Sequence, residues 1–193
     1  MVRHGQTAGN RDNRFIGITD LALTELGLQQ AAAVAPLVDR FDPDVVVSSP
    51  LQRAKDTAAA AVGNRPVTID PAMREVDFGT WEGRTFDEVA ALDPDGFAAF
   101  DAGVAITGFP SGDSVVSVAD AAANALRSHA ATRLLVFSHA TTIRLVWCAL
   151  LGLPISSYRS LVERPANGSW SQLHCIDGVW QPGVFSVVPG GDQ

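Results

Sequence analysis

The apolar residues of this chain occur in two patterns. Short continuous runs predict strands, and longer stretches with periodic apolar positions predict helices. Short β-branched or apolar runs, which are typical of buried strands, occur at 44–48, 67–69 and 134–137. Longer stretches with apolar residues three or four positions apart predict helices at 25–41, 51–62, 86–92, 113–129 and 140–151. Pro36 stands inside the first of these stretches, so we expect that helix to be kinked or shortened.

The two ends of the chain carry weaker patterns. A strand ends at His4 and is oddly short, so either the start codon is placed late or the strand is truncated. Near the other end, 171–175 and 184–188 are predicted as the last strands, around a turn at Asp177-Gly178. The tail 189–193 is expected to be disordered.

Strands that alternate with helices favour an α/β fold, with helices on both faces of one sheet. We predict a three-layer α/β/α sandwich with a mostly parallel central sheet, forming a single domain over 1–188. Between 73 and 109 the pattern is looser, and phenylalanines stand among Gly and Pro without a clear period. The segment 85–110 is therefore predicted to be a cap over the substrate, although ordinary packing explains its phenylalanines equally well.

The composition of the chain limits the classes of partner that it can be expected to bind. The chain has 193 residues, 47% of them hydrophobic, and a net charge of −7, which argues against nucleic acid or an anionic membrane as the partner. Cys148 and Cys175 lie in apolar runs and are expected to be two reduced, buried thiols. No signal peptide or transmembrane span is visible, so we expect a cytoplasmic protein that is a monomer or homodimer. No residue cluster has metal-ligand spacing, so neither a metal nor another cofactor is predicted.

Anion-binding side chains follow three of the predicted strands. Arg3 and His4 end the first strand, Arg53 follows the second, and His139 follows the fourth. Ligands of open α/β sheets bind at the carboxyl ends of the strands, so these residues should converge at one edge. Arg53 also falls in the first turn of a helix, where free N–H groups favour an anion. The sequence therefore predicts a phosphate site.

The motifs that carry this chemistry resemble those of the histidine phosphatase superfamily, also called the phosphoglycerate mutase-like family. The matching segments are, in order, Arg3-His4-Gly5-Gln6-Thr7 with Asn10, 48–54, Arg74-Glu75 before 78–83, 110–114, and Ser138-His139. They keep the family's order over roughly the whole chain. One departure is Ala140, which stands where the family usually has glycine.

The resemblance implies a two-step phosphoryl transfer that needs no metal. His4 would attack phosphorus to give a phosphohistidine, which water then hydrolyses. Arg3, Arg53 and His139 would hold the phosphoryl oxygens, with Asn10 assisting. Glu75 would protonate the leaving oxygen and later activate water, although the nearby carboxylates Asp77 and Glu82 remain alternatives for this role.

The branch of the family is predicted from the segment 85–108. It contains no Lys or Arg, whereas a mutase must hold a second phosphate, so the sequence favours a phosphatase acting on a small phosphorylated metabolite. A mutase and a non-catalytic phospho-ligand-binding protein remain the alternatives. The segment also carries five acids, which would repel a second phosphate if it folds over the site. We therefore expect monophosphates with neutral or apolar leaving groups to be preferred over bisphosphates. The five acids are Asp87, Glu88, Asp93, Asp95 and Asp101.

Overall fold

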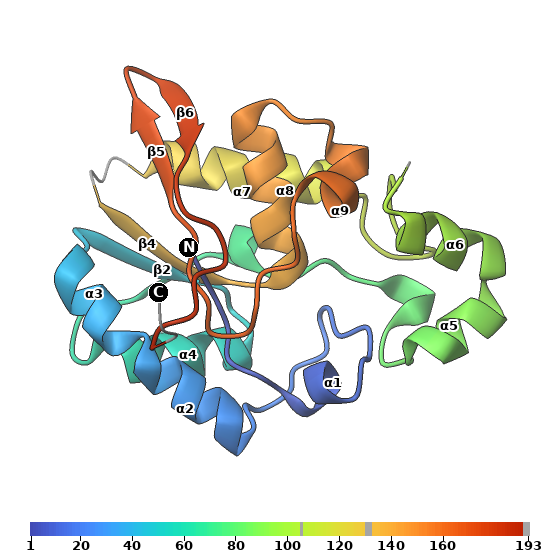
Figure 1. The fold of residues 1–193 in the computed structure, drawn as a ribbon, viewed down its shortest axis with the longest axis horizontal. Helices are drawn as coiled ribbons and strands as arrows, with labels where there is room; N and C mark the ends of the chain where they lie inside the picture. The colour runs from blue at the N-terminus through green and yellow to red at the C-terminus, as the bar shows by residue number, and fades with distance from the viewer. Residues whose placement is uncertain (105, 130–132, 191–193) are drawn as a thin grey trace.

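The centre of the molecule is a four-stranded sheet in which every neighbouring pair is parallel. The computed structural model describes residues 1–104, 106–129 and 133–190 (Figure 1). In that part of the chain the strand order is β1-β4-β2-β3. Strand β4 lies between β1 and β2, with Arg3 opposite Ser138 and Ser48 opposite Phe137. The strands are β1 (Val2–Arg3), β2 (Val45–Ser48), β3 (Thr68–Ile69) and β4 (Leu134–Ser138).

Helices cover both faces of this sheet. Val46, Leu135 and Phe137 pack in one core with α3 and α4, whereas Val47 and Val136 pack in a second core with α7 and α8. This division follows from the strand, in which successive side chains point to opposite faces. The predicted three-layer sandwich with a mostly parallel sheet is confirmed (Figure 1). The helices are α2 (Glu25–Ala33), α3 (Ala35–Phe41), α4 (Gln52–Val62), α7 (Val115–Ser128) and α8 (Ala140–Leu151).

The predicted helix ends are mostly confirmed, and the exceptions have local causes. The helix predicted at 25–41 divides at Val34, which places Pro36 in the first turn of α3, where its missing N–H costs nothing. Helix α4 begins at Gln52, one residue after the start of the helix predicted at 51–62. Leu51 is the N-cap, and the Gln52 N–H donates to the Asp20 carboxylate at 2.8 and 3.0 Å.

Two helices extend to one side of the sheet, at the right of Figure 1. Helix α5 (Phe86–Leu92) was predicted, whereas α6 (Pro94–Ala102) was not. Asp93 begins α6, because its carboxylate accepts the Gly96 N–H at 3.0 Å. The phenylalanines of both helices join one aromatic cluster with Phe15, Phe78, Trp81 and Phe109. The short elements α1 (Ala8–Arg11), η1 (Pro71–Met73), η2 (Gly79–Trp81), η3 (Ile155–Ser157) and α9 (Tyr158–Leu161) complete the described helices.

The last strands form a separate antiparallel hairpin of β5 (Leu173–Ile176) and β6 (Val179–Pro182). The predicted strand at 184–188 is therefore wrong. Asp177 and Gly178 both have positive φ, 51° and 78°, as a two-residue hairpin turn of type I′ requires, so the second strand begins directly after them. The hairpin is largely exposed, and Cys175 on it is exposed rather than buried, whereas Cys148 is buried as expected.

Among the described residues, no helix combines the length and apolar character needed to cross a membrane. Of the tail predicted to be disordered, residues 191–193 lie outside the described part of the chain.

Candidate active site

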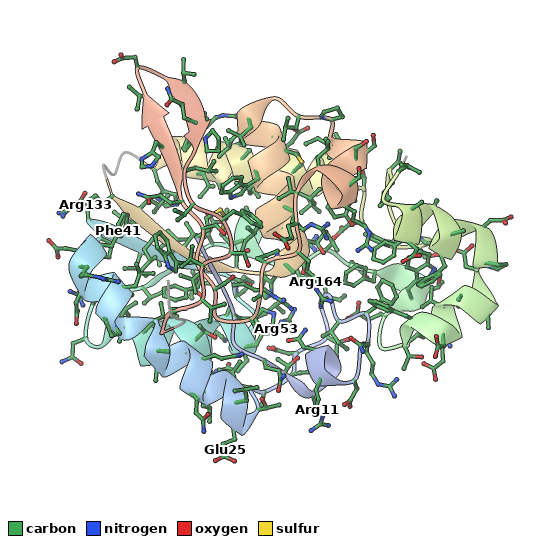
Figure 2. The ribbon with its side chains drawn as sticks, viewed as in Figure 1. Arg11, Glu25, Phe41, Arg53, Arg133 and Arg164 are labelled. Carbon is green, nitrogen blue, oxygen red and sulfur yellow. The ribbon has the colours of Figure 1, made fainter. Side chains whose placement is uncertain are left out.

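The carboxyl ends of β1, β2 and β4 bring four of the predicted site residues together. Arg3 ends β1 and His4 follows it, Arg53 lies in the first turn of α4 after β2, and His139 is the N-cap of α8 after β4. All four are buried, and the rings of His4 and His139 lie 5.0 Å apart. Figure 2 shows Arg53 over the middle of the molecule, whereas Arg11 projects from its edge.

The hydrogen bonds of His4 fix which ring nitrogen is free. Nδ1 lies 2.7 Å from the Gly5 carbonyl oxygen, which can only accept, so Nδ1 carries the hydrogen. Burial, followed by the charges of Arg53 and Arg3, holds the pKa of His4 well below its usual value. The ring is therefore neutral at pH 7, and its Nε2 lone pair is available as a nucleophile.

Gly5 allows the backbone below His4 to pack closely against α2. Its N–H donates to Thr57 Oγ1 at 3.0 Å, which fixes the chain directly after His4. A Cβ at this position would lie 2.2 Å from the carbonyl oxygen of Gly27 in α2. Any side chain here would therefore displace either α2 or the nucleophile.

Arg53 and His139 do not line the cavity beside His4, and they are bonded to each other. Arg53 Nε donates to His139 Nδ1 at 3.2 Å, which leaves the hydrogen of His139 on Nε2, directed at Ser49 Oγ at 2.7 Å. Two further N–H groups of Arg53 donate to the carbonyl oxygens of Thr19 and Gly17. A guanidinium has five N–H groups, so Arg53 keeps two that an anion could use. Both ring nitrogens of His139 are bound to protein atoms, so here it orients Arg53.

Arg3 and Asn10 present donors to a small cavity beside His4. Arg3 donates to the Pro165 carbonyl oxygen at 2.6 Å, and its buried Nε has no partner among the described residues. Burial, and next the charge of Arg164, lowers the pKa of Arg3 to about 9, so it remains a cation at pH 7. The Asn10 oxygen accepts from Thr7 and from Asn167, which leaves its amide N–H groups for a ligand.

Glu75 is held at the N-terminus of α8. Its Oε1 accepts two hydrogen bonds, from the N–H groups of Val76 and Thr142, each at 3.1 Å. The Thr142 hydroxyl lies 3.1 Å from the same oxygen, but its one hydrogen is donated to the Arg74 carbonyl oxygen at 2.6 Å. Its Oε2 accepts one, from the Thr141 N–H at 3.1 Å. Oε2 therefore has the greater capacity left for a proton or a ligand.

The two other carboxylates considered for this role have structural partners elsewhere. Asp77 accepts the Gly79 N–H at 2.8 Å, and Glu82 accepts the N–H groups of Gly17 and Thr19. Glu75 lines the cavity beside His4, and neither Asp77 nor Glu82 does.

This cavity has a volume of about 60 Å³ and is strongly basic. Glu75 is the one carboxylate among the described residues that line it, against five arginines. None of the five acids of the segment 85–108 lines the cavity, so the expectation that they face the substrate is wrong. Phe86 and Phe100 of that segment do line it. The arginines are Arg3, Arg14, Arg144, Arg159 and Arg164.

Four of these arginines were not assigned to the site from the sequence. Arg144 is held by the backbone, since its Nε and one Nη donate to the carbonyl oxygens of Val162 and Arg159. Arg159 and Arg164 follow no strand and belong to no periodic pattern, so no signal in the sequence could place them here. A second cavity, of about 740 Å³, lies beside β4 and the β5–β6 hairpin, and none of the predicted site residues lines it.

No group of three or more His, Cys, Asp or Glu side chains that could hold a metal ion occurs in the part of the chain that the structure describes. The site geometry is instead one of arginine donors, a neutral histidine and one carboxylate. Such a set suits phosphoryl transfer, which depends on positioning and on positive charge around the phosphoryl oxygens.

Comparison with known proteins agrees with this chemistry. A glucosyl-3-phosphoglycerate phosphatase of Mycolicibacterium vanbaalenii is 36% identical, over 97% of this chain and 89% of the relative. Phosphoserine phosphatase 1 of Hydrogenobacter thermophilus is 32% identical, over 90% of this chain and 84% of the relative. The structure of a mycobacterial glucosyl-3-phosphoglycerate phosphatase complexed with VO3 superposes with a TM-score of 0.86 at 32% identity, covering 96% of each chain. The sequence profile of the histidine phosphatase superfamily (branch 1) matches residues 1–186, and this chain belongs to that superfamily.

Proposed function

We propose that this chain hydrolyses phosphomonoesters of small metabolites in two steps, with His4 as the nucleophile. The observation that carries the proposal is the neutral His4 ring, whose Nδ1–H is fixed on the Gly5 carbonyl oxygen beside a cavity lined by Arg3 and Glu75. The relatives named as phosphatases support hydrolysis as the outcome.

In the first step, His4 Nε2 forms a bond to phosphorus while the ester P–O bond breaks. Glu75 gives its proton to the departing oxygen, which leaves as an alcohol. In the second step, Glu75 takes a proton from water, the new hydroxide bonds to phosphorus, and the P–N bond breaks to release phosphate and neutral His4. We assign the transferable proton to Oε2 of Glu75, because Oε1 accepts two backbone N–H bonds and Oε2 accepts one.

The positive groups around the phosphoryl oxygens differ in how they act. Arg3 and Asn10 line the cavity and have free N–H groups, so we assign them direct contacts with the phosphoryl group. Arg53 contributes its two remaining N–H groups. His139 orients Arg53 through Nδ1, and it contacts phosphate directly only if its bond to Ser49 exchanges.

Trapping of the intermediate tests the proposal. The protein is mixed with a ³²P-labelled phosphomonoester, quenched in base within the first turnover, and assayed for label that is stable in base and lost in acid. We expect labelled wild-type protein, no label and no turnover in His4→Ala, and no effect of EDTA. His174→Ala is the matched control, because His174 lies on the exposed hairpin. Near-normal turnover by His4→Ala would refute the mechanism.

The same experiment separates the alternatives. A non-catalytic ligand-binding protein binds the phosphoester and releases no phosphate. A mutase converts 3-phosphoglycerate to its isomer with little phosphate released. Glucosyl-3-phosphoglycerate and phosphoserine, taken from the relatives' names, are the first substrates to test for phosphate release.

A further inference from the structure

Two strand edges without partners face the cavity of about 740 Å³. Residues of β4 and β5 line this cavity, and Met1 and Val2 lie at one end of it. Figure 1 shows the N-terminus beside the lower end of β5, on the side of β4. Among the described residues, no segment pairs with 134–136 on the side of β4 opposite β2, and none pairs with β5 on the side opposite β6.

The cavity continues the gap that β1 itself fills. Strand β1 pairs in parallel with β4, and on its other side it pairs in antiparallel with 169–171, which lead directly toward β5. The Met1 amine donates to the Ser171 carbonyl oxygen at 2.7 Å, and the Ser171 N–H donates back to Met1 at 2.8 Å. The space beyond Met1 is therefore bounded by the same two chain segments as β1. We call this space, between 134–136 and β5, the strand slot.

The backbone of β4 directs a buried hydrogen-bond donor into the strand slot. The Phe137 carbonyl oxygen accepts the Ser49 N–H at 3.0 Å, so the backbone groups of Phe137 face β2. Those of the next residue back, Val136, face the opposite side, because the groups alternate along a strand. In the register of β1 with β4, the acceptor for the Val136 N–H is a carbonyl oxygen directly before Met1. Val136 is only 1% exposed, and buried backbone donors are almost always paired.

Apolar side chains cover both faces of the strand slot. Paired residues of a parallel sheet point to the same face. A position directly before Met1 lies opposite Leu135, on the face covered by α3, where Phe41 lines the slot. The position before that lies opposite Leu134, on the face covered by α7, where Leu126 lines the slot. A strand covered on both faces needs apolar residues at successive positions, so an occupant of this slot must be apolar at both.

We propose that the strand slot binds an extended apolar segment joined to Met1, as further residues of β1. The segment pairs in parallel with β4 and in antiparallel with β5, and its backbone accepts the Val136 N–H. It joins the β5–β6 hairpin to the central sheet, so that no edge remains open between them. Because β1 leads directly into Arg3 and His4, the longer strand also fixes the backbone of the proposed nucleophile. The inference concerns the fold around β1 and does not depend on the proposed function.

Extension of the 193-residue chain tests the inference. The segment Lys-Val-Leu-Val is added directly before Met1, and the matched control carries Lys-Ser-Gly-Ser, which has the same length and charge. We expect the apolar segment to raise Tm by about 5 °C or more, because its aliphatic side chains become buried, and the control to stay within about 1 °C of the unextended chain. Hydrogen exchange at the Val136 amide should become at least about tenfold slower with the apolar segment alone.

A third variant separates strand pairing from burial of apolar surface. Lys-Val-Leu-Pro keeps an apolar residue before Met1 but has no N–H there to donate to the Leu134 carbonyl oxygen, so we expect at most about half of the gain in Tm. The inference is overturned if the apolar and Gly-Ser segments give the same Tm, if the proline variant keeps the full gain, or if exchange at Val136 is unchanged. A second copy of this chain in the slot would also overturn it, and would appear as a dimer that the apolar segment converts to a monomer without a gain in Tm.

Discussion

Replacement of Glu75 by glutamine separates the acid role from the structural role of this side chain. The carboxylate accepts three backbone N–H bonds, two on Oε1 and one on Oε2. In Glu75→Gln the amide oxygen can keep the two N–H bonds of Oε1, but the amide nitrogen then faces the Thr141 N–H, and two donors oppose each other. A buried donor without a partner costs about 1–3 kcal/mol, so the free energy of unfolding should fall by that amount. For a chain of this size, Tm should fall by roughly 2–12 °C.

The catalytic effect should depend on the leaving group. Loss of a general acid costs about 10²- to 10⁴-fold, which applies to an alkyl phosphate such as glycerol 3-phosphate because its alkoxide is a poor leaving group. p-Nitrophenolate leaves without a proton, so kcat/KM for p-nitrophenyl phosphate should fall by about tenfold or less. We use kcat/KM because it reports formation of the phosphohistidine and excludes the later hydrolysis, in which Glu75 acts again as a base.

The assay measures phosphate release from both esters, at a temperature well below the Tm of the variant. Asp77→Asn is the matched control: it makes the same change from acid to amide, Asn can still accept the Gly79 N–H, and the side chain does not line the cavity. We expect Asp77→Asn to remain near the wild type on both substrates. An equal loss on the two esters in Glu75→Gln would remove Glu75 from the acid role, and a selective loss in Asp77→Asn would transfer the role there.

Two further predictions concern pH and backbone packing. Burial keeps His4 and His139 neutral in the folded protein. As the pH falls below about 6.5, protons therefore bind to these two histidines only in the unfolded chain. The free energy of unfolding should decrease in this range by up to about 1.4 kcal/mol per pH unit for each histidine. Urea unfolding at several pH values checks this, and a His4→Gln variant with the same slope as the wild type would contradict it. Gly5→Ala places a Cβ 2.2 Å from the Gly27 carbonyl oxygen, so we expect a loss of about 1–3 kcal/mol in stability together with reduced kcat. Thermal unfolding and phosphate release measure the two effects. An unchanged Tm would show that α2 can move away from the added Cβ without loss of stability.

The central fold could be predicted because each buried strand and amphipathic helix has its own local pattern. Helix α8 was predicted with the bounds that the structure shows, since its apolar run ends at Gly152, which has φ 69°. Helix α6 was missed because Pro94 and Gly96 in its first turn are usually signals of a loop. The strand predicted at 184–188 failed for another reason: a β-branched run indicates an extended segment but does not indicate its partner. Around this turn the segment that follows directly, Val179–Pro182, is the one that pairs.

The residues of the site likewise include some that the sequence could place and some that it could not. Arg3, His4, Arg53 and His139 could be placed together because they follow neighbouring parallel strands, whose carboxyl ends meet at one edge of the sheet. Their detailed contacts could not be predicted, because the bond from Arg53 to His139 depends on side-chain geometry. Asn167, which donates to the His4 carbonyl oxygen and to Asn10, lies in a loop that no pattern connects with β1.

The acidic charge of the segment 85–108 did not predict the charge of the cavity that this segment lines. The segment 85–108 has only acidic charges, and from this we expected it to repel a second phosphate if it folds over the site. In a helix, however, an acid in the first turn stabilises the free N–H groups there, and Glu88 and Asp93 do this in α5 and α6. What the segment gives to the cavity is the apolar surface of Phe86 and Phe100, and the Phe100 ring and carbonyl oxygen hold the guanidinium of Arg159 in place. An acidic segment thus lines a basic cavity, because two of its carboxylates stabilise helix ends while Phe86 and Phe100 face the cavity and Phe100 positions Arg159.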